Sequence, residues 1–151
     1  MTDIEPTADA ADVLARTLWG EARGEGEAGM IAVACVVLNR VRESLEHGGT
    51  YWWGRDVAGV CRARAQFSCW NPSDPNRAKL LSVDLSDPQF RIARKVAEDA
   101  VADRLSDPMI DPTLGATSYK VASLPWPYSW GHPRTPLVTI GRHAFYNLAV
   151  E

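Results

Sequence analysis

The chain has 151 residues, of which 46% are hydrophobic and 23% charged, a composition typical of one globular domain that buries its own core. Its formal net charge of -3 gives no general electrostatic reason to bind nucleic acid. No apolar run is long enough to span a membrane, so we expect no membrane insertion.

We expect residues 1–10 to form a flexible tail and residues 11–151 to form a single catalytic domain. The first five residues, Met1–Glu5, are acidic and lack the apolar stretch of a secretory signal. We therefore expect synthesis in the cytoplasm without a signal peptide.

The first predicted helix covers about residues 9–23, with an aspartate near its start as the cap. Leu14, Leu18 and Glu21 follow at i, i+4 and i+7, so all three point the same way. A carboxyl group on an apolar face is costly to ionise unless a partner offsets the cost, and this suits a proton donor. The alternative is a structural carboxylate on the helix surface or beside an arginine.

Glycines at positions 24 and 26 predict a break, followed by a second helix over about residues 27–45. Its interior, Gly29–Leu38, is apolar on nearly every side, which predicts a centrally buried helix. A strand over residues 33–38 is the competing interpretation, but the length of the whole run favours a helix. Cys35 is expected to be a small core residue.

A short helix is expected within residues 56–64 and a loop over residues 66–76. A third long helix is predicted to run from Pro88 to about residue 105, with Asp87 as its N-cap. Its predicted buried stripe consists of Phe90, Ala93, Ala97 and Val101.

Toward the C-terminus the pattern changes and predicts strands over residues 115–121 and 138–146. The intervening segment, residues 124–133, is rich in aromatic residues and turn formers and is typical of a binding loop. The expected fold class is therefore α+β, mainly helical, with a small β element near the C-terminus. The segment Pro112–Val150 contains no Asp or Glu, so this segment has a positive charge that could face a polyanion.

Three cysteines argue against a full disulfide framework, although Cys61 and Cys69 remain possible partners. Cys69 with His143 is a candidate thiol hydrolase pair, which would indicate an amidase or peptidase. The three histidines lack the spacing of zinc ligands. We therefore expect neither a metal nor a cofactor.

Five segments together resemble the SleB/CwlJ family of cell wall hydrolases, a group related to spore cortex-lytic enzymes. The similarity covers about residues 12–148 and rests on the order and spacing of these segments: Gly20–Glu25, Ile31–Val41, Ala65–Ser68, Asp111–Tyr119 and Ile140–Tyr146.

The resemblance implies a small lysozyme-like fold, peptidoglycan as substrate and cleavage of the glycan strand. It also implies that Glu21 is the catalytic acid, because this is the first glutamate of the family's GEARGE-type motif. The chain has Ser118 and Lys120 where many relatives carry histidine, so a metal or proton-relay role there is not carried over.

Beside Glu21 we expect a set of residues to bind substrate: Glu25, Gln66, Ser68, Tyr119, Trp126, Trp130 and His143. Each also has a structural interpretation. Glu25 would lie at the N-terminal end of the second helix, where a negative charge is favourable. His143 would be a structural histidine on a strand with its hydrogen bonds satisfied, and the tryptophans would pack in the core or cover the surface.

Cleavage of a glycosidic bond normally uses two carboxylates, and the one obvious second carboxylate is Glu25. A site with Glu21 alone suits a lytic transglycosylase, in which the sugar's own C6 hydroxyl closes a 1,6-anhydro ring. We therefore expect a monomeric enzyme that cleaves the MurNAc–GlcNAc bond by this route rather than by hydrolysis.

Two other function classes remain open from the sequence. One is an N-acetylmuramoyl-L-alanine amidase or peptidase acting on the stem peptide, and the other is a non-catalytic wall-binding or virion-structural protein. The expected partner is the peptidoglycan glycan strand, reached after release by a phage holin or carriage on a virion.

Overall fold

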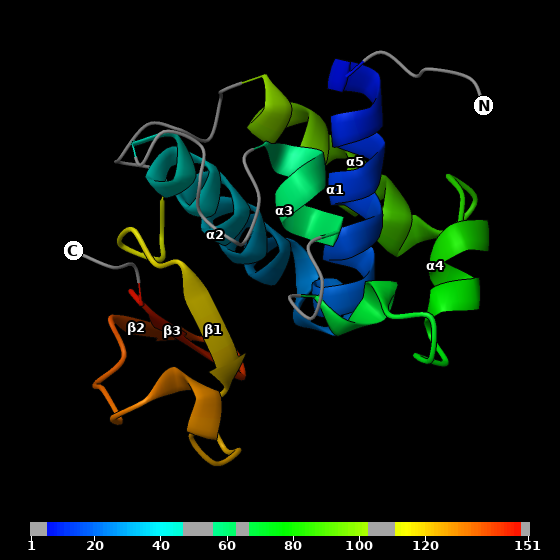
Figure 1. Cartoon of the computed structure of the whole chain (residues 1–151). Coiled ribbons are helices and arrows are strands. Elements are labelled where there is room, and N and C mark those ends of the chain that lie inside the picture. The colour runs from blue at the N-terminus through cyan, green and yellow to red at the C-terminus, as the bar shows by residue number, and fades with distance from the viewer. Residues whose placement is uncertain (1–5, 47–55, 63–66, 103–110, 149–151) are drawn as a thin grey trace.

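The structure, a computed structural model, describes residues 6–46, 56–62, 67–102 and 111–148 (Figure 1). The expected α+β class is confirmed, whereas its lysozyme-like character stays a prediction. In chain order the elements are α1 (Pro6–Ala22), η1 (Arg23–Glu25), α2 (Gly26–Glu46), α3 (Val57–Arg62), η2 (Ser68–Trp70), α4 (Arg77–Ser82), α5 (Pro88–Val101), β1 (Ser118–Val121), η3 (Tyr128–Trp130), β2 (Val138–Ile140) and β3 (His143–Tyr146), where η marks a 3-10 turn.

The first two helices lie close to their predicted bounds, with one correction. α1 begins at Pro6, so residues 6–10 of the expected tail are already helical. Proline suits the first turn of a helix, where its missing N–H is not needed. The predicted break falls at η1, and α2 covers the predicted second helix with one extra residue at each end.

α2 is the central helix, as its apolar composition predicts. Met30, Val33 and Val37 pack into a core shared with α1, α3 and α5. Ala32 and Val36 pack into a second apolar cluster, which reaches Phe145 of the sheet. Figure 1 shows the same arrangement, with α2 standing between the three strands on one side and α1 and α5 on the other.

The sheet has three antiparallel strands in the order β1-β3-β2. This corrects the expectation of one strand over residues 138–146, because β2 ends at Ile140 and the chain folds back at Gly141 and Arg142. Ile140 pairs with His143, and Gly141 has a φ of +57°. A positive φ in a two-residue turn suits a hairpin, and glycine adopts it without strain.

The strand register decides which side chains share a face of the sheet. Tyr119 pairs with Phe145, and Ser118 pairs with Tyr146. Since neighbouring residues of a strand point to opposite faces, Tyr119 and Phe145 lie on the face toward α2. Tyr146 lies on the other face.

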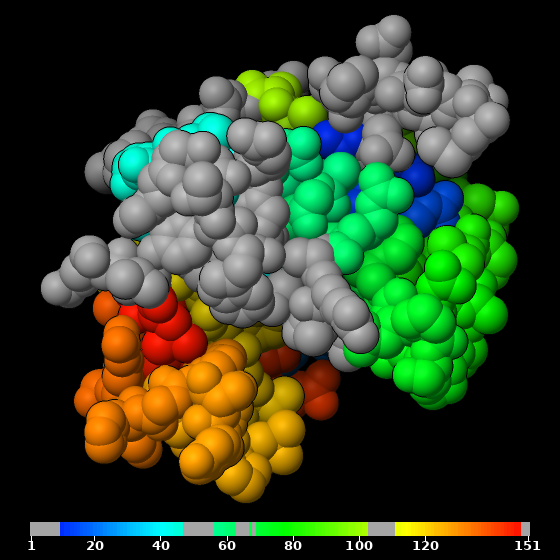
Figure 2. All heavy atoms as spheres, in the orientation of Figure 1, coloured from blue at the N-terminus to red at the C-terminus, as the bar shows by residue number. Residues whose placement is uncertain are grey.

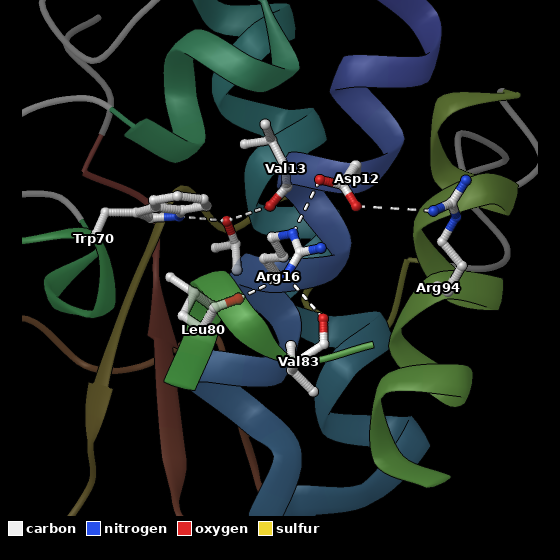
Figure 3. A network of polar contacts seen from close by, with 8 residues as sticks. Asp12, Val13, Arg16, Trp70, Leu80, Val83 and Arg94 are labelled. Atoms are coloured by element: carbon white, nitrogen blue, oxygen red, sulfur yellow. Dashed lines mark hydrogen bonds and ion pairs between the residues drawn. The ribbon is translucent and has the colours of Figure 1, made fainter. Parts of the chain in front are cut away.

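A polar network joins α4 and α5 to α1 (Figure 3). Arg16 of α1 donates to the carbonyl oxygens of Leu80 at 2.7 Å and Val83 at 3.0 Å. Its Nε also pairs with Asp12, which in turn lies 3.8 Å from Nη1 of Arg94 on α5. This network positions α4, an element that the sequence did not predict.

The same view shows how η2 is attached to α1 (Figure 3). The indole Nε1 of Trp70 donates to the hydroxyl of Thr17 at 2.8 Å, and that hydroxyl donates to the carbonyl oxygen of Val13 at 2.8 Å. Thr17 is fully buried, so the satisfied bonds offset the cost of burying its polar atom. Cys69, beside Trp70, is thereby placed against α1.

Two further expectations concern the caps and the cysteines. Asp87 is the N-cap of α5, as predicted, since its carboxylate accepts from the amides of Gln89 and Phe90. The cysteines, Cys35, Cys61 and Cys69, are all buried free thiols.

The described residues contain neither a candidate membrane span nor a candidate metal site. In that part of the chain no helix is both long and apolar enough to cross a bilayer. Within it, no three His, Cys, Asp or Glu side chains gather in a way that would hold a metal ion.

Candidate active site

Glu21 lies in the last turn of α1. It is on the same helix face as Leu14 and Leu18, which are both fully buried. Its side chain is half-buried. Oε1 accepts a hydrogen bond of 2.5 Å from the hydroxyl of Tyr119 on β1. The carboxyl group therefore sits where the helical part of the molecule meets the sheet.

Tyr119 is held by an aromatic cluster on the α2 face of the sheet. Its ring centroid lies 4.9 Å from that of His143 in an edge-on arrangement, and 5.6 Å from that of Phe145. Burial raises the pKa of Tyr119 well above 10.0, and the negative charge and hydrogen bond of Glu21 raise it further. Tyr119 therefore stays a neutral donor at physiological pH.

Cys69 of η2 also contacts Glu21 through a hydrogen bond between their side chains. Burial raises the pKa of the Cys69 thiol, and the charge of Glu21 and a hydrogen bond to it act in the same direction. Gly20 makes this approach possible, because a Cβ there would lie 2.8 Å from the Cβ of Cys69. Since a thiol nucleophile needs a lowered pKa, this environment disfavours the Cys69–His143 pair.

Figure 2 shows these parts of the molecule from outside. The sheet with its long loop, in yellow to red, and the green segment around α4 form separate parts of the visible face, with a notch between them. Glu21 bonds to Tyr119 of the sheet and to Cys69, just before the green segment. The carboxyl group of Glu21 therefore lies where the sheet and η2 meet.

Arg40 is a charged residue near this junction to which sequence reasoning gave no role. It is only 5% exposed, its Nε donates to the carbonyl oxygen of Thr117 at 2.5 Å, and its guanidinium lies 5.2 Å from the ring centroid of Phe67. Burial lowers its pKa, while Tyr119, Cys61 and Glu21 oppose that shift. The helix spacing could have indicated that Arg40 is buried, because Val33, Val37 and Arg40 share one face of α2.

Glu25 in η1 is a second half-buried carboxylate. Its side chain is 12% exposed, and Oε1 accepts from the amide of Arg142 at 3.1 Å and from its Nε at 3.2 Å. Burial raises the pKa of Glu25, but the hydrogen bonds and charge of Arg142, with His143, more than offset it. The pKa is lowered, so Glu25 is ionised at neutral pH.

His143 is close enough to both carboxylates for the charge of each to act on it. It is 8% exposed, its ring packs against Tyr119, and its Nδ1 lies 3.8 Å from Oε1 of Glu25. Burial lowers its pKa, and the charges of Glu25 and then Glu21 only partly reverse that shift. The imidazole is therefore neutral near pH 7.

The structure brings together four of the predicted site residues, Glu21, Glu25, Tyr119 and His143. Gln66 lies outside the described residues. Ser68 belongs to η2, and its side chain is outside the described part.

Trp126 and Trp130 lie elsewhere. Both pack edge-on against Tyr146, with ring centroids 4.9 Å and 5.8 Å from it. Tyr146 is on the sheet face opposite Tyr119. The structure therefore does not bring these two tryptophans to Glu21, and their binding role stays a prediction.

Two comparisons with known proteins cover most of the chain. The family model described as "Cell Wall Hydrolase" matches residues 24–146. The spore cortex-lytic enzyme of Bacillus subtilis (strain 168) is 30% identical over 137 residues, covering 88% of this chain and 36% of that relative.

The chain spans about a third (36%) of the length of the Bacillus relative. No solved structure matches. The family match starts at residue 24, after Glu21, so the importance of Glu21 rests on its position and contacts.

Proposed function

The chain belongs to the cell wall hydrolase family, and from this membership we propose that it degrades peptidoglycan by cutting the glycan strand. The bond proposed is the MurNAc–GlcNAc linkage, with Glu21 as general acid and base. The observation that carries this proposal is the half-buried carboxyl group of Glu21, bonded to the neutral hydroxyl of Tyr119.

The proposed reaction is that of a lytic transglycosylase. In the proposed first step the carboxyl group of Glu21 donates a proton to the glycosidic oxygen as the bond between that oxygen and C1 breaks. The C6 hydroxyl of the same MurNAc then bonds to C1, and its proton returns to Glu21. Atoms and charge balance without water, and the product carries a 1,6-anhydro ring.

The contacts of Glu25 support this route over hydrolysis. Hydrolysis normally needs a second carboxylate as nucleophile or base. Glu25 is the nearest candidate in the sequence, but both hydrogen bonds to its Oε1 come from Arg142. Its engagement there leaves Glu21 as the group available for proton transfer.

Tyr119 and Arg40 are proposed to support Glu21. A hydroxyl that donates to a carboxylate stabilises its charged form, which Glu21 adopts once its proton has moved to the leaving group. The buried cation of Arg40 acts on the same charge, and its effect is strengthened by the low local dielectric. Neither residue needs to exchange a proton in the reaction.

Product masses after digestion of purified peptidoglycan test the proposal. Anhydro-muropeptides support the transglycosylase, whereas fragments with reducing ends would establish hydrolysis instead. Free stem peptides would establish an amidase or peptidase. Binding to the wall without any product would favour the non-catalytic alternative.

A further inference from the structure

We propose that Glu25 is a positioning residue rather than a second catalytic carboxylate. It fixes the turn at Gly141 and Arg142, and through that turn the ring of His143, which supports Tyr119 against Glu21. The test of this inference by enzyme activity rests on the proposed function. The test by NMR titration of His143 rests on the structure alone.

The first argument is how closely the turn covers the carboxylate of Glu25. Oε1 accepts both bonds from Arg142. Oε2 faces Gly141, where a Cβ would lie 3.1 Å from it, and the φ of +57° at Gly141 suits glycine. With 12% of the side chain exposed, the carboxylate has little surface left for a sugar or an attacking water.

The second argument is that α2 makes room for this side chain. Gly29 lies in the first turns of α2, and a Cβ there would lie 2.3 Å from the Cβ of Glu25 and 3.4 Å from its Cγ. The side chain of Glu25 therefore occupies the space that the Cβ of any other residue at position 29 would fill. Since alanine is the better helix former, glycine at this position is explained by the contact with Glu25.

The third argument is the short path from Glu25 to Glu21. Arg142 is followed directly by His143, whose ring contacts Tyr119 edge-on with centroids 4.9 Å apart. Tyr119 then donates to Glu21. A shift of the turn would move the imidazole and, with it, the phenol that holds the proposed acid.

The charged and titratable groups around His143 come from every element packed on it. Glu25 in η1 and Glu21 in α1 raise its pKa, Arg142 in its own turn lowers it, and burial lowers it most. Tyr119 of β1 contacts the ring as a neutral group. Loss or displacement of the Glu25 charge therefore lowers the pKa of His143.

The kinetic test compares three variants on purified peptidoglycan. Glu25→Gln keeps an oxygen that accepts from the Arg142 amide, so we expect its activity to stay within about tenfold of wild type. Glu25→Ala and Gly29→Ala remove or displace the acceptor, and misplacement of the site lowers activity about a hundredfold. Gly24→Ala is the matched control, because its Cβ would meet only the end of the Arg142 side chain, at 3.4 Å.

Equal and near-complete loss in Glu25→Gln and Glu25→Ala, with both folded, would overturn the proposal and make Glu25 a catalytic carboxylate. Wild-type activity in Glu25→Ala would overturn it too. Thermal unfolding of each variant separates loss of the fold from loss of positioning. If Gly29→Ala does not fold, the two Glu25 variants decide the outcome.

An NMR titration of the His143 imidazole tests the same proposal without substrate. The midpoint should move to lower pH in Glu25→Gln and in Gly29→Ala, and should not move in Gly24→Ala. An unchanged midpoint in both Glu25→Gln and Gly29→Ala would overturn the proposal. If the wild-type protein cleaves no peptidoglycan, the proposed function fails, yet this titration still decides the role of Glu25.

Discussion

Tyr119 and Glu21 lie 98 residues apart in the chain, and the hydroxyl of one donates to the carboxylate of the other at 2.5 Å. This single bond joins the sheet to the end of α1. A carboxyl group that faces inward from a helix thereby gains a neutral donor, and the pair forms the centre of the candidate active site.

The first prediction concerns this hydrogen bond. Tyr119→Phe removes the hydroxyl but keeps the ring against His143 and Phe145, so the fold should be retained. Loss of a hydrogen bond to a charged group should lower kcat by about 10- to 100-fold. The control is Tyr128→Phe, since Tyr128 is fully exposed and its variant should turn over peptidoglycan like the wild type. Equal activity of Tyr119→Phe and Tyr128→Phe would remove Tyr119 from the site.

The second prediction concerns Cys69. Its raised pKa keeps the thiol protonated at neutral pH, so iodoacetamide should label it far more slowly than a free cysteine in solution. Cys69→Ala should keep peptidoglycan turnover within about tenfold of wild type, because a thiol is only a weak hydrogen-bond donor to Glu21. A loss of several thousandfold in a folded Cys69→Ala protein would instead support the thiol hydrolase.

The third prediction concerns stability against pH. Burial raises the pKa of Asp111, but bonds from Thr113, Asn39 and Gly115 more than offset it, and the pKa falls below its ordinary value of 3.8. A carboxyl group whose pKa is lowered by folding stabilises the fold at pH values above its unfolded-state pKa. This stabilisation is lost as the pH falls through its folded-state pKa. Asp111→Asn should therefore be less stable than wild type near pH 7, and the difference should shrink toward about pH 2.

Urea unfolding of the Asp111→Asn and wild-type proteins at both pH values measures this difference. A gap in the free energy of unfolding that is the same at both pH values would show that the charge of Asp111 contributes nothing.

The fourth prediction concerns the attachment of α4. Arg16→Met leaves the carbonyl oxygens of Leu80 and Val83 without the donor that they have in the structure. We expect the free energy of unfolding to fall by about 1–3 kcal/mol. The control is Arg91→Met, whose exposed bond to Leu85 should contribute less than about 0.5 kcal/mol. Equal effects in the two variants would contradict the role given to Arg16.

The local parts of the fold were predictable from the sequence. The apolar surround of Gly29–Leu38 predicted a central helix, and two separate clusters on α2 confirm it. The cap at Asp87 was predicted from the residue types alone. Both features depend on neighbours in the chain, which a sequence pattern records directly.

The hairpin was not predicted, because residues 138–146 have the composition of one strand. The turn depends on the positive φ of Gly141 and on the bonds that Glu25 accepts from Arg142. Glu25 and Arg142 are 117 positions apart in the chain, and no local sequence pattern indicates a contact over that separation. The short helix α4 was missed for a related reason, since Arg16 of α1 helps hold it in place.

The same limit applies to the site. Glu21 was found because its helix spacing marks it, whereas its partner on β1 was only one of several candidates. The expectation that Trp126 and Trp130 bind substrate beside Glu21 depended on which sheet face they cover. That face is fixed by the pairing of Ser118 with Tyr146, and the pairing became visible only once the strands were placed.

Turnover of purified peptidoglycan by Glu21→Gln is the most direct test of the proposal that Glu21 is the acid and base. Glutamine keeps the shape of the side chain and an oxygen that accepts from Tyr119, but it cannot donate the proton. We predict a loss of at least about 10²- to 10⁴-fold in release of glycan fragments, with an unchanged unfolding temperature. Release at a rate within a few-fold of wild type would contradict the proposed role of Glu21.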